Sequence, residues 1–119
     1  MSSANPRLPR LALAVTLAIA AGCATTANIR TARQAESLRD YDLAVASYTK
    51  TLRADPANRD AQMGLERARL RGSEAHFQRG QRLASAGKFD DAVIELQLAS
   101  ELNPGHADVE RSLRAARLS

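Results

Sequence analysis

Apolar residues recur at spacings of three and four along most of the chain, which is the period of an amphipathic helix. One such run covers 92–102, where the apolar positions on a single face are Ala92, Val93, Leu96, Ala99 and Leu102. The stretch 44–52 repeats the pattern with Ala44, Val45, Tyr48 and Leu52. No segment alternates between apolar and polar residues as a strand does. The pattern therefore predicts an all-α fold.

Breaks between the helices are marked by proline and glycine. Asp55-Pro56 is expected to end the helix over 44–52, and Asn103-Pro104-Gly105 the helix over 92–102. Gly87 is expected to end the helix before the second run, which Asp90 or Asp91 would start.

Four further helices are predicted from the same periodicity, near 27–39, 59–71, 74–86 and 107–118. A stripe with one apolar residue every seven positions crosses the middle two, and it consists of Met63, Leu70, Phe77 and Ala84. This stripe favours one long helix over 59–86. The alternative is a break at Gly72-Ser73, with Ser73 as the N-cap of a separate helix.

A different pattern stands at the N-terminus, where Arg7 and Arg10 precede an apolar run from Leu11 to Ala21. A helix of this length spans about 16 Å, roughly half of a bilayer core, so the run predicts a secretory signal and not a membrane span. The run ends in Ala20-Ala21-Gly22-Cys23. Small residues before the only cysteine resemble the lipobox of bacterial lipoproteins, although Ala20 stands where leucine is usual.

This resemblance implies a signal peptide at 1–22, cleavage between Gly22 and Cys23, lipid on Cys23, a short tether at 23–26 and a helical domain at 27–119. No aspartate follows Cys23, which favours attachment to the outer membrane facing the periplasm. Two or three acyl chains hold a protein stably on a membrane, where one holds it only marginally. The alternative is an ordinary signal peptide with a chance cysteine.

An internal repeat appears when the chain is compared with itself at an offset of 48 residues. Pro56 then aligns with Pro104, Asp60 with Asp108, and Ala68-Arg69-Leu70 with Ala116-Arg117-Leu118. The sequence thus predicts two 48-residue copies, at about 25–72 and 73–119.

Each copy resembles the tetratricopeptide repeat (TPR), a helix–turn–helix unit of 34 residues. The residues at its packing and turn positions are Tyr41, Ala44, Tyr48 and Pro56 in the first copy, and Gly80, Leu83, Phe89, Ala92, Leu96, Ala99 and Pro104 in the second. The resemblance implies that the small residues allow close helix contact and that Leu83, Phe89 and Leu96 fill the space between helices. The alternative is a generic pair of Ala/Leu hairpins, since the period departs from 34.

Charge is unevenly distributed along a chain that has 17 Lys and Arg against 13 Asp and Glu, a net charge of +4. Arg7 and Arg10 lie in the expected signal peptide, which leaves 15 − 13 = +2, too little for a nucleic-acid-binding domain. Residues 59–82 are basic and 88–110 acidic. Either these are solvated faces, or the basic helix meets anionic lipid or an acidic partner.

Catalytic chemistry has no support in the sequence, and no metal or cofactor is expected. The two histidines, His76 and His106, have no carboxylate pattern that would complete a zinc site. Asp90-Asp91 is explained by its place at the start of a helix. Glu95 is expected to be exposed and tolerant of substitution.

The expected function is a lipid-anchored scaffold that holds envelope or secretion proteins in a groove between its helices. It resembles TPR pilotins and other small TPR lipoproteins that assemble pili, secretion pores or outer-membrane barrels. The alternative is the N-terminal fragment of a longer secretin-type channel, because the second copy ends at Ser119 without a capping helix. On that view Leu113, Ala116 and Leu118 would be uncovered, and residues 24–119 alone would self-associate or be only marginally folded.

Overall fold

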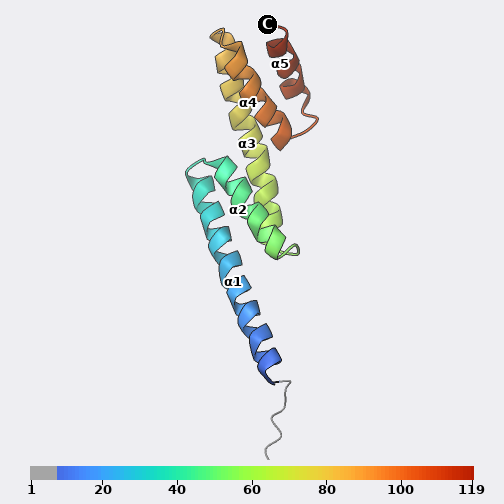
Figure 1. Cartoon of the computed structure of the whole chain (residues 1–119). Coiled ribbons are helices and arrows are strands. Elements are labelled where there is room, and N and C mark those ends of the chain that lie inside the picture. The colour runs from blue at the N-terminus through green and yellow to red at the C-terminus, as the bar shows by residue number, and fades with distance from the viewer. Residues whose placement is uncertain (1–7) are drawn as a thin grey trace, which may run out of the picture.

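The computed structural model describes the backbone of residues 8–119 and the side chains from residue 22 onward. It contains five helices and no strand within that range: α1 Leu8–Ser37, α2 Tyr41–Ala54, α3 Arg59–Ser85, α4 Phe89–Leu102 and α5 Ala107–Arg117 (Figure 1). The prediction of an all-α fold is confirmed. Residues 1–7 of the expected signal peptide lie outside the described residues.

The helix ends follow from local hydrogen bonding. The Leu43 backbone N–H donates to the side chain of Asp40, which caps α2, and Ala61 N–H donates to Asn58, which caps α3. Gly87 has φ +76° after α3 and Gly105 has φ +80° after α4, a conformation that favours glycine. The predicted start of the fourth helix was wrong, because Lys88 is its N-cap and both aspartates lie in its first turn.

Two helices, α1 with 30 residues and α3 with 27, are about twice as long as the other three described helices. The helix predicted at 27–39 is the C-terminal part of α1, which runs without a break through Gly22 and Cys23. The prediction of one long helix is confirmed by α3, which is continuous from Arg59 to Ser85. Ser73 is therefore no N-cap, and its hydroxyl instead donates to the carbonyl oxygen of Ala99 on α4 at 2.8 Å.

The helices pack as two three-helix units that share α3. In the first unit α2 packs between α1 and the N-terminal half of α3, and in the second α4 packs between the C-terminal half of α3 and α5 (Figure 1). The first core consists of Ala32, Ala35, Ala44, Tyr48, Ala61 and Ala68. The second core consists of Ala92, Leu96, Leu113 and Ala116. With so many alanines in contact, each core depends on its few large side chains.

Glycines allow α3 to approach its neighbours closely. A Cβ at Gly80 would lie 2.6 Å from Cγ of Leu96, and one at Gly64 would collide with the ring of Tyr48. At Gly72, where the two units meet, it would lie 3.0 Å from Leu102 and 3.1 Å from Tyr41. Gly72 thus serves close packing within a continuous helix.

The expectation that α5 leaves an apolar stripe uncovered was wrong. Val109, Leu113 and Ala116 are buried because α5 folds back beside α4. Only Leu118, just beyond the helix, is exposed, at 89%.

The stripe of apolar residues along α3 is partly buried in its second half and exposed in its first. Phe77 and Ala84 pack against the second core, whereas Met63 is 67% and Leu70 48% exposed. A repeat of seven residues drifts by about 20° per heptad around a helix with 3.6 residues per turn. The stripe therefore rotates from solvent toward the core along the helix.

Candidate functional site

The residues predicted at TPR packing positions divide between core, turns and surface. Ala44, Tyr48, Gly80, Ala92, Leu96 and Ala99 are buried, while Tyr41 and Leu83 are partly buried. Pro56 and Pro104 are exposed in the turns that follow α2 and α4. Phe89 is 37% exposed, in contrast to the expectation that it fills the space between helices. It begins α4 beyond the end of α3, so little of α3 faces it.

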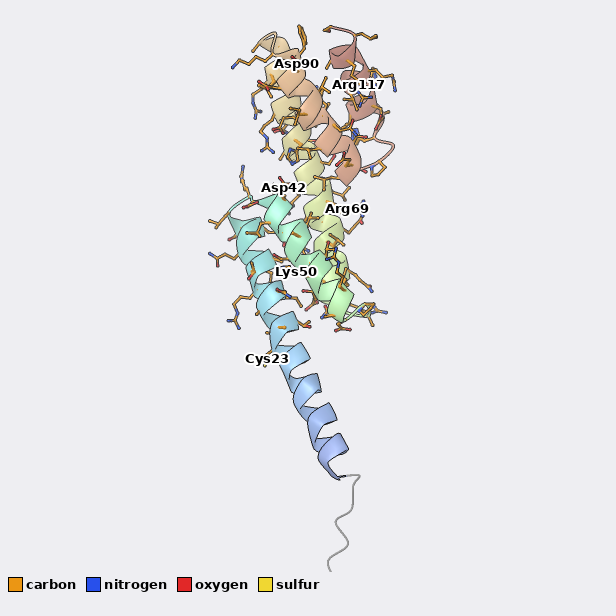
Figure 2. All side chains as sticks on the ribbon, viewed as in Figure 1. Cys23, Asp42, Lys50, Arg69, Asp90 and Arg117 are labelled. Atoms are coloured by element: carbon orange, nitrogen blue, oxygen red, sulfur yellow. The ribbon has the colours of Figure 1, made fainter. Side chains whose placement is uncertain are left out.

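Cys23 is an exposed free cysteine on α1 (Figure 2). It lies in the part of α1 that extends beyond α2 and α3. Within the described part of the chain, no helix combines the length and hydropathy required to cross a bilayer.

The gap between α1 and α3 in the first unit is closed by a charged cluster. Arg67 donates from Nε and Nη2 to the two carboxylate oxygens of Glu36, at 2.8 and 2.7 Å. The Tyr48 hydroxyl donates to the same carboxylate at 2.7 Å. The hydrogen bond from Arg67 holds the pKa of Glu36 below its ordinary value, although burial raises it. Burial and the neighbouring Glu36 raise the pKa of Tyr48.

The Glu36–Arg67 ion pair is expected to contribute to stability at neutral pH and to lose this contribution in acid. Because the pKa of Glu36 is lowered from 4.5 by folding, the contribution is complete above that value and disappears as the pH falls through the folded-state pKa. Urea denaturation should therefore show Glu36→Gln less stable than wild type at neutral pH, with the difference shrinking in acid. Asp60→Asn, which removes the exposed pair with Arg33, should change little at either pH.

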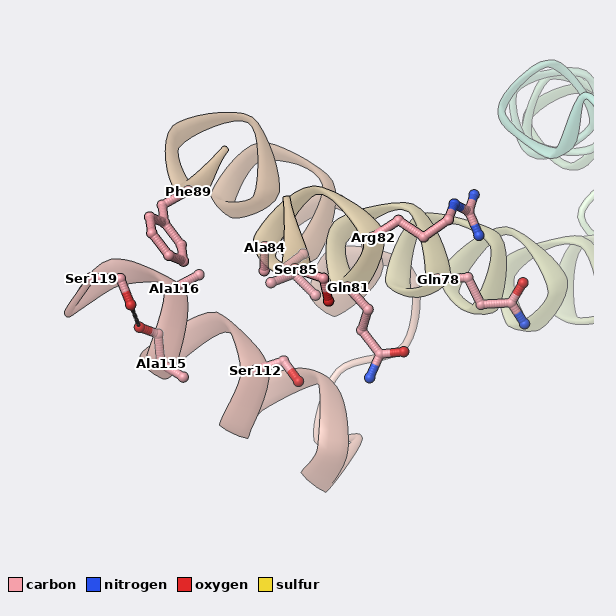
Figure 3. Close-up of a pocket in the computed structure, with 11 residues that line it drawn as sticks. Gln78, Gln81, Arg82, Ala84, Ser85, Phe89, Ser112, Ala115, Ala116 and Ser119 are labelled. Atoms are coloured by element: carbon pink, nitrogen blue, oxygen red, sulfur yellow. Dashed lines mark hydrogen bonds between the residues drawn. The ribbon is translucent and has the colours of Figure 1, made fainter. Parts of the chain in front are cut away.

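The corresponding gap in the second unit is an open cleft. At the offset of 48 residues, Glu36 corresponds to Ala84, Arg67 to Ala115 and Tyr48 to Leu96. All three lie in the lining of a cleft of about 730 Å³ between α3 and α5 (Figure 3). The residues that close the first gap are thus replaced by side chains that leave the second one open.

The lining of this cleft combines an apolar floor with hydrogen-bonding side chains. Its floor includes Ala84, Leu96 and Ala116, with Phe89 at one end. Its polar residues are Gln78, Gln81, Arg82, Ser85, Ser112 and Ser119 (Figure 3). The lining contains one arginine and no carboxylate. An arrangement of this kind suits an apolar side chain whose backbone or polar groups meet amides and hydroxyls.

A buried histidine connects the two units. His76 of α3 is 4% exposed, with Nδ1 2.6 Å from Oε2 of Glu95 on α4 and Nε2 3.0 Å from Oδ1 of Asp42 on α2. Arg79 Nε donates to the same Glu95 oxygen at 3.1 Å. Burial raises the pKa of Glu95, and the hydrogen bonds from His76 and Arg79 outweigh burial, so the net pKa is lowered. The sequence did not reveal this cluster, because its partners are distant along the chain.

The expectation that Glu95 is exposed was therefore wrong, because its side chain is only 23% exposed. Glu95→Ala should lower the free energy of unfolding by about 1–3 kcal/mol, because it leaves the buried His76 and Arg79 without their shared acceptor. Glu66→Ala, an exposed position on the same fold, should stay within about 0.5 kcal/mol of wild type. Equal urea midpoints for the two variants would show that the cluster contributes nothing.

Among the described residues, no group of three or more His, Cys, Asp or Glu side chains is placed to hold a metal ion. The ring of His106 lies against Phe77, with centroids 6.2 Å apart. No protein-family model matches the chain, and comparison with characterised proteins finds no significant relative.

Proposed function

We propose that this chain is a lipid-anchored scaffold of the bacterial cell envelope, which holds a segment of a partner protein in the cleft between α3 and α5. The observation that carries the proposal is the difference between the two units. The first gap is filled by Glu36, Arg67 and Tyr48, whereas alanine and leucine leave about 730 Å³ open at the equivalent place. Closing the second gap in the same way would stabilise the fold further, so stability alone does not explain why it is open.

The proposed anchor is lipid on Cys23, attached after cleavage behind Gly22. The lipobox-like order of small residues before the only cysteine supports this, as does the exposure of Cys23. The absence of aspartate after Cys23 favours the outer membrane, with the domain facing the periplasm. The domain then works where pili, secretion pores and outer-membrane barrels are assembled.

The proposed relationship to TPR proteins is supported by the close contacts of small residues. Ala44, Ala92 and Ala99 have no exposed surface, and Gly80 lies directly against Leu96. TPR hairpins pack in this manner and present grooves to partner segments. The long α3, shared by both units, is the main departure from that family.

Closing the cleft is expected to abolish partner binding without unfolding the protein. The double substitution Ala84→Glu with Ala115→Arg copies the Glu36–Arg67 ion pair into the second unit. The matched control, Ala46→Glu with Lys50→Arg, introduces the same two side chains on exposed positions of α2. Each full-length protein would be purified from crosslinked cells and its bound proteins quantified by mass spectrometry.

Partner recovery should fall at least tenfold for the closed-cleft variant and stay unchanged for the control, with similar melting temperatures for both. If the closed-cleft variant recovers the same proteins in the same amounts, the cleft is not the binding site and the proposal fails.

A further inference from the structure

Three hollows follow one another along one face of α3 and share residues at their borders. The first, of about 620 Å³, lies around Met63 and Leu70 and shares Arg71 with the second. The second, of about 470 Å³, shares Gln78 and Arg82 with the cleft. Residues 63, 67, 71, 74, 78 and 82 are three or four positions apart, which places them on one side of the helix. We name this surface the α3 face.

The middle hollow is strongly basic. Its lining contains Arg39, Arg71, Arg79 and Arg82, with Glu74 as its only acid. Arg79 is bonded to Glu95, but the side chains of the other three arginines have no ion pair or hydrogen bond with any described residue. Arg39 lies in the turn between α1 and α2, so the basic charge comes from two elements.

Nearby carboxylates offset only part of this charge, because Glu74 is the one acid in the lining and Glu36 interacts with Arg71. Glu74 accepts a hydrogen bond from Gln78, and Asp42 and Glu95 lie beside His76. Arg39, Arg71 and Arg82 against Glu74 leave the hollow positively charged, so it attracts an anion. The two flanking hollows are apolar in their floors: Met63 and Leu70 on one side, Ala84 and Leu96 on the other.

We infer that the α3 face binds one segment of a partner protein in which acidic residues are flanked on both sides by apolar residues. The acidic residues lie against Arg39, Arg71 and Arg82, one apolar end enters the cleft, and the other covers Met63 and Leu70. This inference rests on the proposed function and specifies the chemistry of the partner. The distance from Met63 to Ala84 along the helix is about 32 Å, which an extended segment of about ten residues spans.

A protein segment fits this surface better than an anionic membrane does. The basic hollow continues into the cleft, which a bilayer surface cannot enter. The 15 residues from Cys23 to Ser37 extend over about 21 Å of helix, and Arg39 follows them, so the arginines lie at the far end of α1 from the proposed anchor. Charge and shape together therefore favour an acidic and apolar peptide.

The test is a selection of random dodecapeptides against the detergent-solubilised full-length lipidated protein. Enriched peptides should carry at least two acidic residues between apolar ones. Arg71→Ser combined with Arg82→Ser should weaken their binding roughly fivefold, in line with two exposed charge contacts. The control, Lys50→Ser with Arg53→Ser, removes the same charge from α2 and should leave binding unchanged.

Three results would overturn the inference. In the first, the enriched peptides are neutral or basic, or the Arg71 and Arg82 substitutions do not weaken their binding. The cleft would then still bind a partner, and the proposed function would stand. In the second, short-chain phosphatidylglycerol displaces the peptides as effectively as free acidic peptide does. Lipid headgroups would then be the ligand of the α3 face. If wild type enriches no peptide over the closed-cleft variant, the proposed function fails together with the inference.

Discussion

Tyr48→Ala is expected to lower the free energy of unfolding by about 3–5 kcal/mol, the usual cost of removing a buried aromatic ring. Tyr48 is 1% exposed and is the largest side chain in the first core, which otherwise consists of alanines. Its ring lies directly against Gly64, and its hydroxyl donates to Glu36. The other fully buried apolar residues of this core are alanines, which cannot fill the resulting cavity, so the loss should be near the top of that range.

The control for this prediction is Tyr48→Phe. It keeps the ring and removes the hydroxyl, with its hydrogen bond to Glu36 and the longer one from Arg67, which should cost about 0.5–1.5 kcal/mol. Urea denaturation of both variants separates the packing contribution from the hydrogen bond. If Tyr48→Ala is no less stable than Tyr48→Phe, the described packing of the first unit is incorrect.

Cys23→Ser is expected to abolish incorporation of a clickable fatty acid and to leave unprocessed precursor. Serine has no thiol to receive the lipid, and Cys23 is the only cysteine in the chain. Loss of two or more acyl chains removes the contribution that makes membrane attachment stable. Metabolic labelling followed by fractionation of the cells measures both effects.

The matched control is Ala24→Ser, which introduces the same side chain one residue later and should be labelled like wild type. A Cys23→Ser protein that is labelled and processed normally would exclude the lipoprotein assignment.

The sequence predicted the helices well because their signals are local. Pro56, Gly87 and Pro104 mark helix ends through backbone geometry, and the small residues at Gly80, Ala92 and Ala99 indicate close contact. Even the continuity of α3 could be inferred, since apolar residues continue through Gly72-Ser73 at a helical spacing.

The cleft and the cluster around His76 were missed because they depend on residues that are distant in sequence. The open cleft results from Ala84 and Ala115, which are unremarkable until the structure shows that the equivalent residues of the first unit, Glu36 and Arg67, form an ion pair. His76 is bonded to residues 34 and 19 positions away. Met63 and Leu70 are exposed because the seven-residue stripe along α3 rotates slowly around the helix. The spacing of apolar residues alone does not show which end of such a stripe faces the core.

The most direct test of the account is photocrosslinking in living cells from a reactive amino acid placed at Gln81, in the cleft, or at Lys50, on the exposed side of α2. Each would be introduced separately into the full-length lipidated protein. We expect a discrete adduct from Gln81 in the membrane fraction, and none of that size from Lys50. The same adducts from both positions, or none from Gln81, would contradict the claim that the second unit holds a partner in its cleft.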